Sequence, residues 1–250
     1  MRRYLAYIRT IFLARTVILS KETISRKVRV RRRRECPNRE NTKGRMMTGT
    51  ATADLTVAID QDAVDRLFCD ARTASHFTDA PVTDEQKRTI YELTKMGPTA
   101  FNSQPLRVTW VESPEARERL VQHMSRGNQE KTRNAPLTAI LSYDENWHEH
   151  FPEFLPAAPH MKGMYDENDD MRITSGKANS HIQVGYFIIA ARTAGLAAGP
   201  MTGFDPVGVD EEFFEGTGKH SIVVVNLGTP VEPEYARNPR FNAEDVTETI

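Results

Sequence analysis

The chain has 250 residues, of which 39% are hydrophobic and 27% are charged, and its formal net charge is −1. This length allows one large domain or two small ones. The first 45 residues hold 15 lysines and arginines against three glutamates, and the rest of the chain is acidic, which argues against nucleic-acid binding by that larger part.

Residues 1–45 are predicted to be a basic N-terminal extension, and residues 46–250 the folded domain. The apolar part of the extension is 16 residues long and contains two arginines, so it is too short and too charged to span a bilayer. Three interpretations stay open: a transit-like arm, a basic arm for nucleic acid or anionic lipid, or sequence upstream of a true start at Met46 or Met47. We favour the last, and we expect the extension to be disordered if it is made.

The two cysteines, Cys36 and Cys69, show neither metal-ligand spacing nor a disulfide framework, which indicates a reducing, cytoplasmic compartment. Cys69 is predicted to be a small core residue. No metal site is predicted. The acidic run in residues 166–170 lacks the glycine and glutamate positions of a calcium loop, and we interpret it as a solvated turn.

The first predicted helix spans residues 60–71 and is capped by Asp60. Arg72 and Thr73 follow in a polar turn whose guanidinium, hydroxyl and amide groups suit a phosphate. A solvated arginine at a helix C-terminus is the alternative, and the residues alone do not separate the two.

A second helix begins at the capping box Thr83–Gln86 and ends before Gly97. Its predicted apolar stripe is Ile90, Leu93 and Met96.

The most distinctive stretch follows at once, Gly97–Val108, with the sequence GPTAFNSQPLRV. Two prolines fix backbone angles and remove amide donors, so the remaining polar groups can face a flat, hydrogen-bonding ligand. We expect this loop to form a flavin site through Pro98, Thr99, Asn102 and Gln104.

Strands are predicted at residues 107–111, 137–143 and 221–227. Further helices are predicted after Ser113 and over residues 179–194, the latter buried on most faces. On that helix, the polar residues Asn179, Ser180 and Gln183 face either a ligand or internal hydrogen-bond partners. In the segment Gly199–Pro206, two glycines and a proline expose backbone amides, and Asp205 caps the next helix.

These pieces resemble the FMN-dependent nitroreductase family in order and spacing. The resemblance is carried by Asp70-Ala71-Arg72-Thr73, by Asn102-Ser103-Gln104-Pro105, by the sequence GPMTGFD from Gly199 to Asp205, and by Arg240. It covers residues 64–245 and is closest to the malonic semialdehyde reductases of pyrimidine breakdown. It implies an α+β fold, with helices around a small mixed, mainly antiparallel sheet, and a homodimer whose flavin sites each use both chains.

The resemblance also implies FMN as the cofactor, with NADPH or NADH as the electron donor. Arg72 and Arg240 would bind the FMN phosphate, with Arg237 as the nearest rival. No side chain is expected to be catalytic, because the flavin carries the hydride. The residues expected beside the reactive edge of the flavin, with the Thr202 backbone N–H near the hydride-carrying nitrogen, are Pro200, Met201, Thr202 and Gly203.

We therefore predict an oxidoreductase that reduces malonic semialdehyde to 3-hydroxypropanoate by ping-pong hydride transfer. Lys131 and Arg133 are the candidate partners of the substrate carboxylate. Thr202 stands where many family members carry glutamate, which weakens an inference of nitroaromatic reduction. In related folds, residues 147–164 supply a lid over the flavin, and packing as a hydrophobic satellite is the alternative.

Three other functions stay open. The first is a nitro, quinone or enoate reductase of the same fold. The second is a non-catalytic flavin-binding protein, and the third is a nucleic-acid protein resting on the basic extension. No membrane partner is predicted.

Overall fold

The computed structural model describes residues 57–231 and 236–250. The predicted extension, residues 1–45, lies outside these ranges. Within them, no helix combines the length and the apolar character that a membrane span needs.

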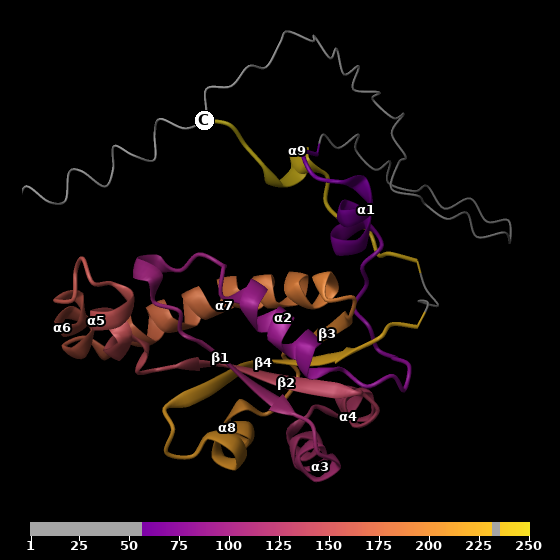
Figure 1. The fold of residues 1–250 in the computed structure, drawn as a ribbon, viewed down its shortest axis with the longest axis horizontal. Helices are drawn as coiled ribbons and strands as arrows, with labels where there is room; N and C mark the ends of the chain where they lie inside the picture. Colours follow the sequence, from indigo (N-terminus) through magenta and orange to yellow (C-terminus); the bar gives the residue numbers. More distant parts are fainter. Residues whose placement is uncertain (1–56, 232–235) are drawn as a thin grey trace, which may run out of the picture. The chain divides into compact units, whose positions relative to one another are not determined.

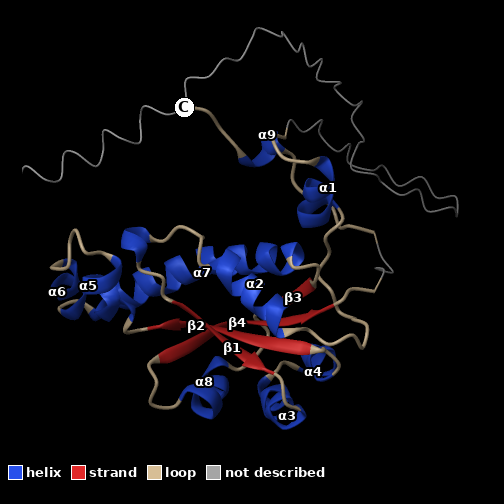
Figure 2. Cartoon of the chain, viewed as in Figure 1, coloured by secondary structure: helices blue, strands red, loops and turns tan. Residues whose placement is uncertain are grey.

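A four-stranded sheet forms the centre of the fold (Figures 1 and 2). Its strands are β1 (Leu106–Val111), β2 (Leu137–Asp144), β3 (Ala197–Met201) and β4 (Lys219–Gly228), in the order β1-β2-β4-β3. The three predicted strands are confirmed, whereas β3 falls in residues that the sequence predicted to be a loop. All three pairings are antiparallel. The described sheet is therefore purely antiparallel, whereas a mixed, mainly antiparallel sheet was expected.

Two long helices cover one face of the sheet (Figure 2). They are α2 (Asp84–Thr94) and α7 (Asp169–Thr193). Because successive strand residues point to opposite faces, alternate residues of β2 and β4 reach these helices. The larger core cluster includes Ile90, Leu137, Ala139, Leu141, Phe187, Ala191, Val223, Val225 and Leu227.

Shorter helices cover the other face: α3 (Pro114–His123), α4 (Arg126–Arg133) and α8 (Pro206–Phe214). The intervening strand residues point toward them. This side holds a second cluster of Val111, Leu120, Met124, Ile140, Val209, Phe214 and Val224. Both faces of β2 and β4 are therefore buried, which fixes their register.

Most of the predicted helix starts are confirmed by side-chain caps. Thr83 Oγ1 accepts from the Gln86 N–H at 3.2 Å, and Gln86 Oε1 accepts from the Thr83 N–H at 3.0 Å, completing the capping box. Ser113 and Asp205 cap α3 and α8. Asp60 caps α1 (Gln61–Val64), which continues as a π-helical segment, η1 (Asp65–Cys69).

The buried faces of α2 and α7 are narrower than predicted. On α2, Ile90 is buried but Leu93 is 38% exposed, and Met96, just beyond the end of the helix, is 69% exposed. On α7, Ile182 and Tyr186 are 47% and 43% exposed, so the prediction of burial on most faces was wrong for the described chain. Cys69 is half-buried, which corrects its predicted place in the core.

The aromatic segment folds into short helices: η3 (Trp147–His150), α5 (Phe151–Phe154) and α6 (Met161–Asp166). Trp147, Phe151 and Tyr165 form a third buried cluster. Of the two interpretations left open for this segment, the cluster supports the hydrophobic satellite, while Phe154 remains 37% exposed. A last short helix, α9, spans Ala243–Val246.

Candidate functional site

The polar loop after α2 has an unusual backbone. It contains the short 3-10 helix η2 (Ala100–Asn102). Phe101, Asn102 and Gln104 have φ angles of 54°, 54° and 44°. Residues with a Cβ rarely adopt such angles, at a cost of about 1–2 kcal/mol each. Contacts outside the loop must hold it in this conformation.

The contacts come from α7. Asn179 Oδ1 accepts from the Ala100 N–H at 2.7 Å, and Gln183 Oε1 accepts from the Leu106 N–H at 3.1 Å. Both side chains are buried. Of the two interpretations left open for these side chains, internal hydrogen bonding is therefore the one observed, and their role is to brace the loop.

The side chains of the loop form a polar strip. Asn102 Nδ2 donates to the Phe154 carbonyl oxygen at 3.0 Å, and Gln104 Nε2 donates to Asn102 Oδ1 at 3.1 Å. Thr99 Oγ1 accepts from the Gln104 N–H at 3.2 Å. Pro98 and Asn102 are exposed, whereas Thr99 and Gln104 are half-buried. The strip ends at Phe154 of α5, whose aromatic ring is partly exposed. The polar strip is therefore accessible beside this ring.

Three arginines converge on the C-terminal end of η1. Arg72 Nη1 donates to the carbonyl oxygens of Cys69 and Ala71 at 2.9 and 3.1 Å. Arg237 Nη2 donates to the same two oxygens at 2.9 and 2.6 Å. Arg192, which the sequence analysis missed, donates to the Leu67 carbonyl oxygen at 2.7 Å. The sequence could have indicated Arg192, because it is a single charged residue at the end of an apolar helix.

The electrostatics of this arginine group favour an anion. Burial lowers the pKa of Arg237, and the positive charges of Arg72, Arg240 and Arg192 lower it further. Arg240 is exposed and donates to the Asn238 and Pro239 carbonyl oxygens. Arg72 Nε is buried and has no hydrogen-bond partner among the described residues. A phosphate would satisfy this donor and reduce the repulsion.

The segment after Arg72 lies against β3. The Ala74 N–H donates to the Ala198 carbonyl oxygen at 3.3 Å, and a Cβ on Gly199 would lie 2.5 Å from the Ala74 carbonyl oxygen. Thr73, in the same segment, is exposed. The segment that follows Arg72 is thus held against the first residues of β3, the strand that leads into the loop at Thr202. At the end of β3, Pro200 and Met201 are half-buried, and in the loop that follows, Thr202 is exposed and Gly203 is half-buried.

The two predicted substrate cations lie on α4, beside the loop after β3. The Gly203 carbonyl oxygen accepts from the Ser125 N–H and from Asn128 Nδ2, at 2.9 and 3.0 Å. Lys131 is half-buried one turn beyond Asn128. Arg133 is exposed, with Nε and Nη2 each 3.0 Å from a Glu118 carboxylate oxygen, so it is already engaged.

The polar loop and the arginine group lie at different ends of the fold. The loop leads into β1 and the arginines adjoin β3, the two opposite edge strands of the sheet. Along α7, Asn179 contacts the loop and Arg192 contacts η1. These residues are 13 positions apart, or about 20 Å at the rise of an α-helix. The two halves of the predicted site do not meet within one chain.

One group of described residues has potential metal-ligand geometry, although no metal site was predicted. The ligand atoms of His148, Glu149 and Asp166 lie within 4.8 Å of one another. The ammonium group of Lys162 pairs with both carboxylates, at 2.8 Å from Asp166 and 3.2 Å from Glu149. The positive charge of Lys162 thus already balances the carboxylates that a metal ion would otherwise bind. The run at residues 166–170 is exposed throughout and contains the turn between α6 and α7, as predicted. Asp166 itself ends α6 and binds His148 and Lys162.

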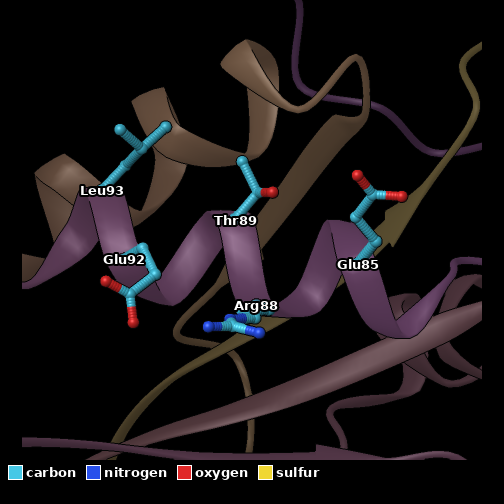
Figure 3. Close-up of a pocket in the computed structure, with 5 residues that line it drawn as sticks. All are labelled: Glu85, Arg88, Thr89, Glu92 and Leu93. Atoms are coloured by element: carbon cyan, nitrogen blue, oxygen red, sulfur yellow. The ribbon is translucent and has the colours of Figure 1, made fainter.

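A shallow hollow lies along α2, lined by Glu85, Arg88, Thr89, Glu92 and Leu93 (Figure 3). Glu85, Thr89 and Leu93 point to the same side of the helix. All five lining residues come from one helix, so the hollow is an open surface and contains none of the predicted site residues.

Comparisons with known proteins match most of this chain. The sequence model of the nitroreductase family matches residues 70–229. A Streptomyces griseus protein named as a candidate NADH dehydrogenase/NAD(P)H nitroreductase is 48% identical over 198 residues, covering 78% of this chain and 100% of the relative. A similarly named Leptothrix cholodnii protein is 45% identical, covering 70% and 88%.

Solved structures show the same fold. A candidate nitroreductase from Exiguobacterium sibiricum, solved in complex with FMN, has a TM-score of 0.67 at 17% identity, covering 78% of this chain and 99% of that one. A nitroreductase family protein from Streptococcus pneumoniae has a TM-score of 0.66 at 16% identity, covering 76% and 99%.

Proposed function

The chain belongs to the nitroreductase family, and from this premise we propose that it is an FMN-dependent NAD(P)H oxidoreductase that reduces a small aldehyde, malonic semialdehyde. The observation that supports FMN most strongly is the arginine group at the end of η1. A phosphate monoester carries a charge of about −1.5 to −2, which two of these guanidiniums would balance. The buried, unpaired Nε of Arg72 offers a donor that such a group would use.

The residues have separate tasks in this proposal. Arg72, with Arg237 or Arg240, would hold the phosphate. Residues 200–203 and the polar loop would hold the planar ring by backbone and side-chain hydrogen bonds. When bound, FMN would supply the hydride-transfer chemistry between the nicotinamide and the substrate, which no side chain of the chain provides.

We propose that the active form is a homodimer. The two halves of the site lie about 20 Å apart along α7, so a second copy would bring its polar loop to the first copy's arginines. Exposed apolar side chains on α2, in the segment after it and on α7 would offer the contact. They are Leu93, Met96, Phe101, Ile182 and Tyr186, which are between 38% and 69% exposed. Leu93 lies on the same side of α2 as Thr89 and Glu85 in Figure 3.

Lys131 is the favoured partner of the substrate carboxylate. It is on α4, the helix that contacts the loop after β3 through Asn128. Arg133 was the second candidate, and its bidentate pair with Glu118 makes it less available. A cation at Lys131 suits a short aldehyde that carries an acid group.

A second candidate function is reduction of nitroaromatics or quinones. Exposed aromatic rings support it: Phe101 is 50% exposed and Phe154 37%, and the His150 ring lies 5.7 Å from that of Phe154. Planar substrates stack on such rings. The names of the bacterial relatives point the same way.

Anaerobic spectroscopy tests these proposals. Protein reconstituted with FMN should retain the flavin absorbance after desalting, and NADPH or NADH should bleach it. Malonic semialdehyde should then restore the absorbance faster than a nitroaromatic or a quinone. The reverse order would favour the second candidate. Flavin that is retained but not bleached would indicate a binding protein, and loss of all flavin on desalting would overturn the cofactor assignment.

A further inference from the structure

The loop after β3 is clamped from one side. The Gly203 carbonyl oxygen accepts two hydrogen bonds, one from the Ser125 N–H at 2.9 Å and one from Asn128 Nδ2 at 3.0 Å. The Phe204 N–H donates to the Thr202 carbonyl oxygen at 3.1 Å. These bonds fix the direction of the backbone on both sides of Gly203.

The contact between Asn128 and Gly203 leaves no room for a side chain. A Cβ on Gly203 would lie 2.7 Å from Asn128 Nδ2 and 3.3 Å from Ser125 Oγ. Residue 203 is therefore a glycine at the point where the Asn128 side chain contacts the loop. Asn128 is on α4, which is far from Gly203 in the sequence. Such a fit sets the position of the loop to within a fraction of an ångström.

A buried polar chain fixes α4 itself. Thr132, one turn beyond Asn128, accepts from Asn226 Nδ2 at 3.3 Å, and Asn226 Oδ1 accepts from the Thr138 hydroxyl at 2.9 Å. All three side chains are buried, and Asn226 Nδ2 also lies 4.0 Å from Met201 Sδ. The helix is thus held against the centre of the sheet while Asn128 reaches outward to the loop.

We infer that Asn128 is a positioning residue: by holding the carbonyl of the Gly203–Phe204 peptide group, it fixes the turn in which the Phe204 N–H donates to the Thr202 carbonyl oxygen, and this turn orients the Thr202 and Gly203 amides toward the flavin. This inference rests on the proposed function. Asn128 touches neither FMN nor substrate in this assignment. It acts through the peptide groups, whose orientation determines how strongly they interact with the ring.

The loop has other attachments that should keep it folded without Asn128. The Asp205 N–H donates to the His123 carbonyl oxygen at 2.8 Å, the Ser125 N–H still reaches Gly203, and Met124 pairs with Phe204. Truncating Asn128 should therefore loosen the orientation of the loop without unfolding it.

The test compares Asn128→Ala and Asn128→Asp with the control Asn134→Ala. Asp keeps the shape of Asn128 but cannot donate. Asn134 ends the same helix and donates to Glu130 at 2.8 Å on the exposed side. The measurements are the FMN dissociation constant, the flavin midpoint potential, the rate constant of anaerobic reduction by NADPH and the thermal midpoint.

Both Asn128 variants should reduce the rate constant of flavin reduction about 10- to 100-fold and shift the two-electron midpoint potential by about 30 mV, the equivalent of a tenfold change in equilibrium constant. The control should change neither, and Asn128→Ala should melt as the control does. Unchanged potential and rate in both Asn128 variants would overturn the inference alone. Wild-type protein that binds no FMN would overturn both the proposed function and this inference.

Discussion

Arg72 and Arg237 donate hydrogen bonds to the same two carbonyl oxygens, those of Cys69 and Ala71. The two positively charged guanidinium groups are thus held next to each other at the C-terminal end of η1. The carbonyl groups offset part of the repulsion between the guanidiniums, and an anion would offset more. The first prediction follows from this pair.

Replacement of Arg72 by alanine should weaken FMN binding by about 1.5–3 kcal/mol, roughly 10- to 150-fold, because a charge-assisted hydrogen bond to the phosphate is lost. Fluorescence titration of FMN measures the change. Arg66→Ala, which removes an exposed arginine from the same helical segment, is the control and should leave affinity unchanged. Equal affinity in Arg72→Ala and wild type would contradict the phosphate assignment.

Alanine at Gly199 should push the Arg72–Ala74 segment away from β3, because its Cβ would lie 2.5 Å from the Ala74 carbonyl oxygen. We expect a loss of about 1–3 kcal/mol of unfolding free energy and weaker FMN binding. Gly163→Ala is the matched control, since nothing lies within 4 Å of its Cβ position on α6, and it should gain about 0.5–1 kcal/mol. Urea denaturation distinguishes them, and equal stability of the two variants would count against the close contact.

Glycine at residue 101 should stabilise the chain. Phe101 has a φ of 54°, which costs about 1–2 kcal/mol for a residue with a Cβ, and the greater freedom of glycine in the unfolded chain offsets part of the gain. We expect about 0.5–1 kcal/mol more unfolding free energy by urea denaturation of protein that also carries Tyr186→Asp, so that loss of Phe101 from the proposed dimer contact does not enter. Phe241, which is 82% exposed and has no positive φ, is the control site for the same change. Equal effects at both sites would show that backbone strain is not involved.

A charge on the exposed face of α7 should disrupt the proposed homodimer. Tyr186→Asp places a carboxylate on a surface that would be desolvated by the second copy, so light scattering should report a monomer. FMN retention should fall with it, because the two halves of the site would separate. Val207→Asp alters an apolar residue of α8 that is 64% exposed and should leave both properties unchanged. A dimer in Tyr186→Asp would exclude this face as the interface.

The stability of the aromatic segment should depend on pH through His148. Burial lowers the pKa of His148, and the positive charge of Arg172 lowers it as well, against the raising effects of Asp166 and Glu149. The unfolded chain therefore binds a proton more readily than the folded one. The unfolding free energy should be highest above the unfolded pKa of about 6.5 and fall as the pH decreases below it. Urea denaturation at pH 7.5 and 5.5 should show a smaller decrease in His148→Gln. An equal decrease would assign the dependence to other groups.

Local signals in the sequence predicted much of the fold. The capping box of α2, the caps of α3 and α8 and the β-branched run of β4 depend on neighbouring residues, and each is confirmed. Strand β3 was missed because its sequence, AAGPM, contains two residues that are rare in strands. It forms because β4 pairs with it along its whole length.

The candidate site was harder to predict because its contacts are non-local. The family resemblance paired Arg72 with Arg240 and gave Arg237 as the rival, whereas Arg237 is the one that shares carbonyl partners with Arg72. Arg192 was missed because its carbonyl partner belongs to Leu67, far away in the sequence. The apolar stripe of α2 predicted burial of Leu93 and Met96, which the described chain leaves exposed. A hydrophobic pattern alone does not distinguish a core face from a surface that pairs with another molecule.

The position of Pro200 has a consequence for solubility at high concentration. It lies in β3, an edge strand of the sheet, and proline has no backbone donor to offer to an incoming strand. The backbone of Ala74 already occupies one acceptor of the same edge, the Ala198 carbonyl oxygen. A strand from another molecule could therefore not form a complete set of backbone hydrogen bonds with β3. Aggregation by strand pairing at this edge of the sheet is disfavoured.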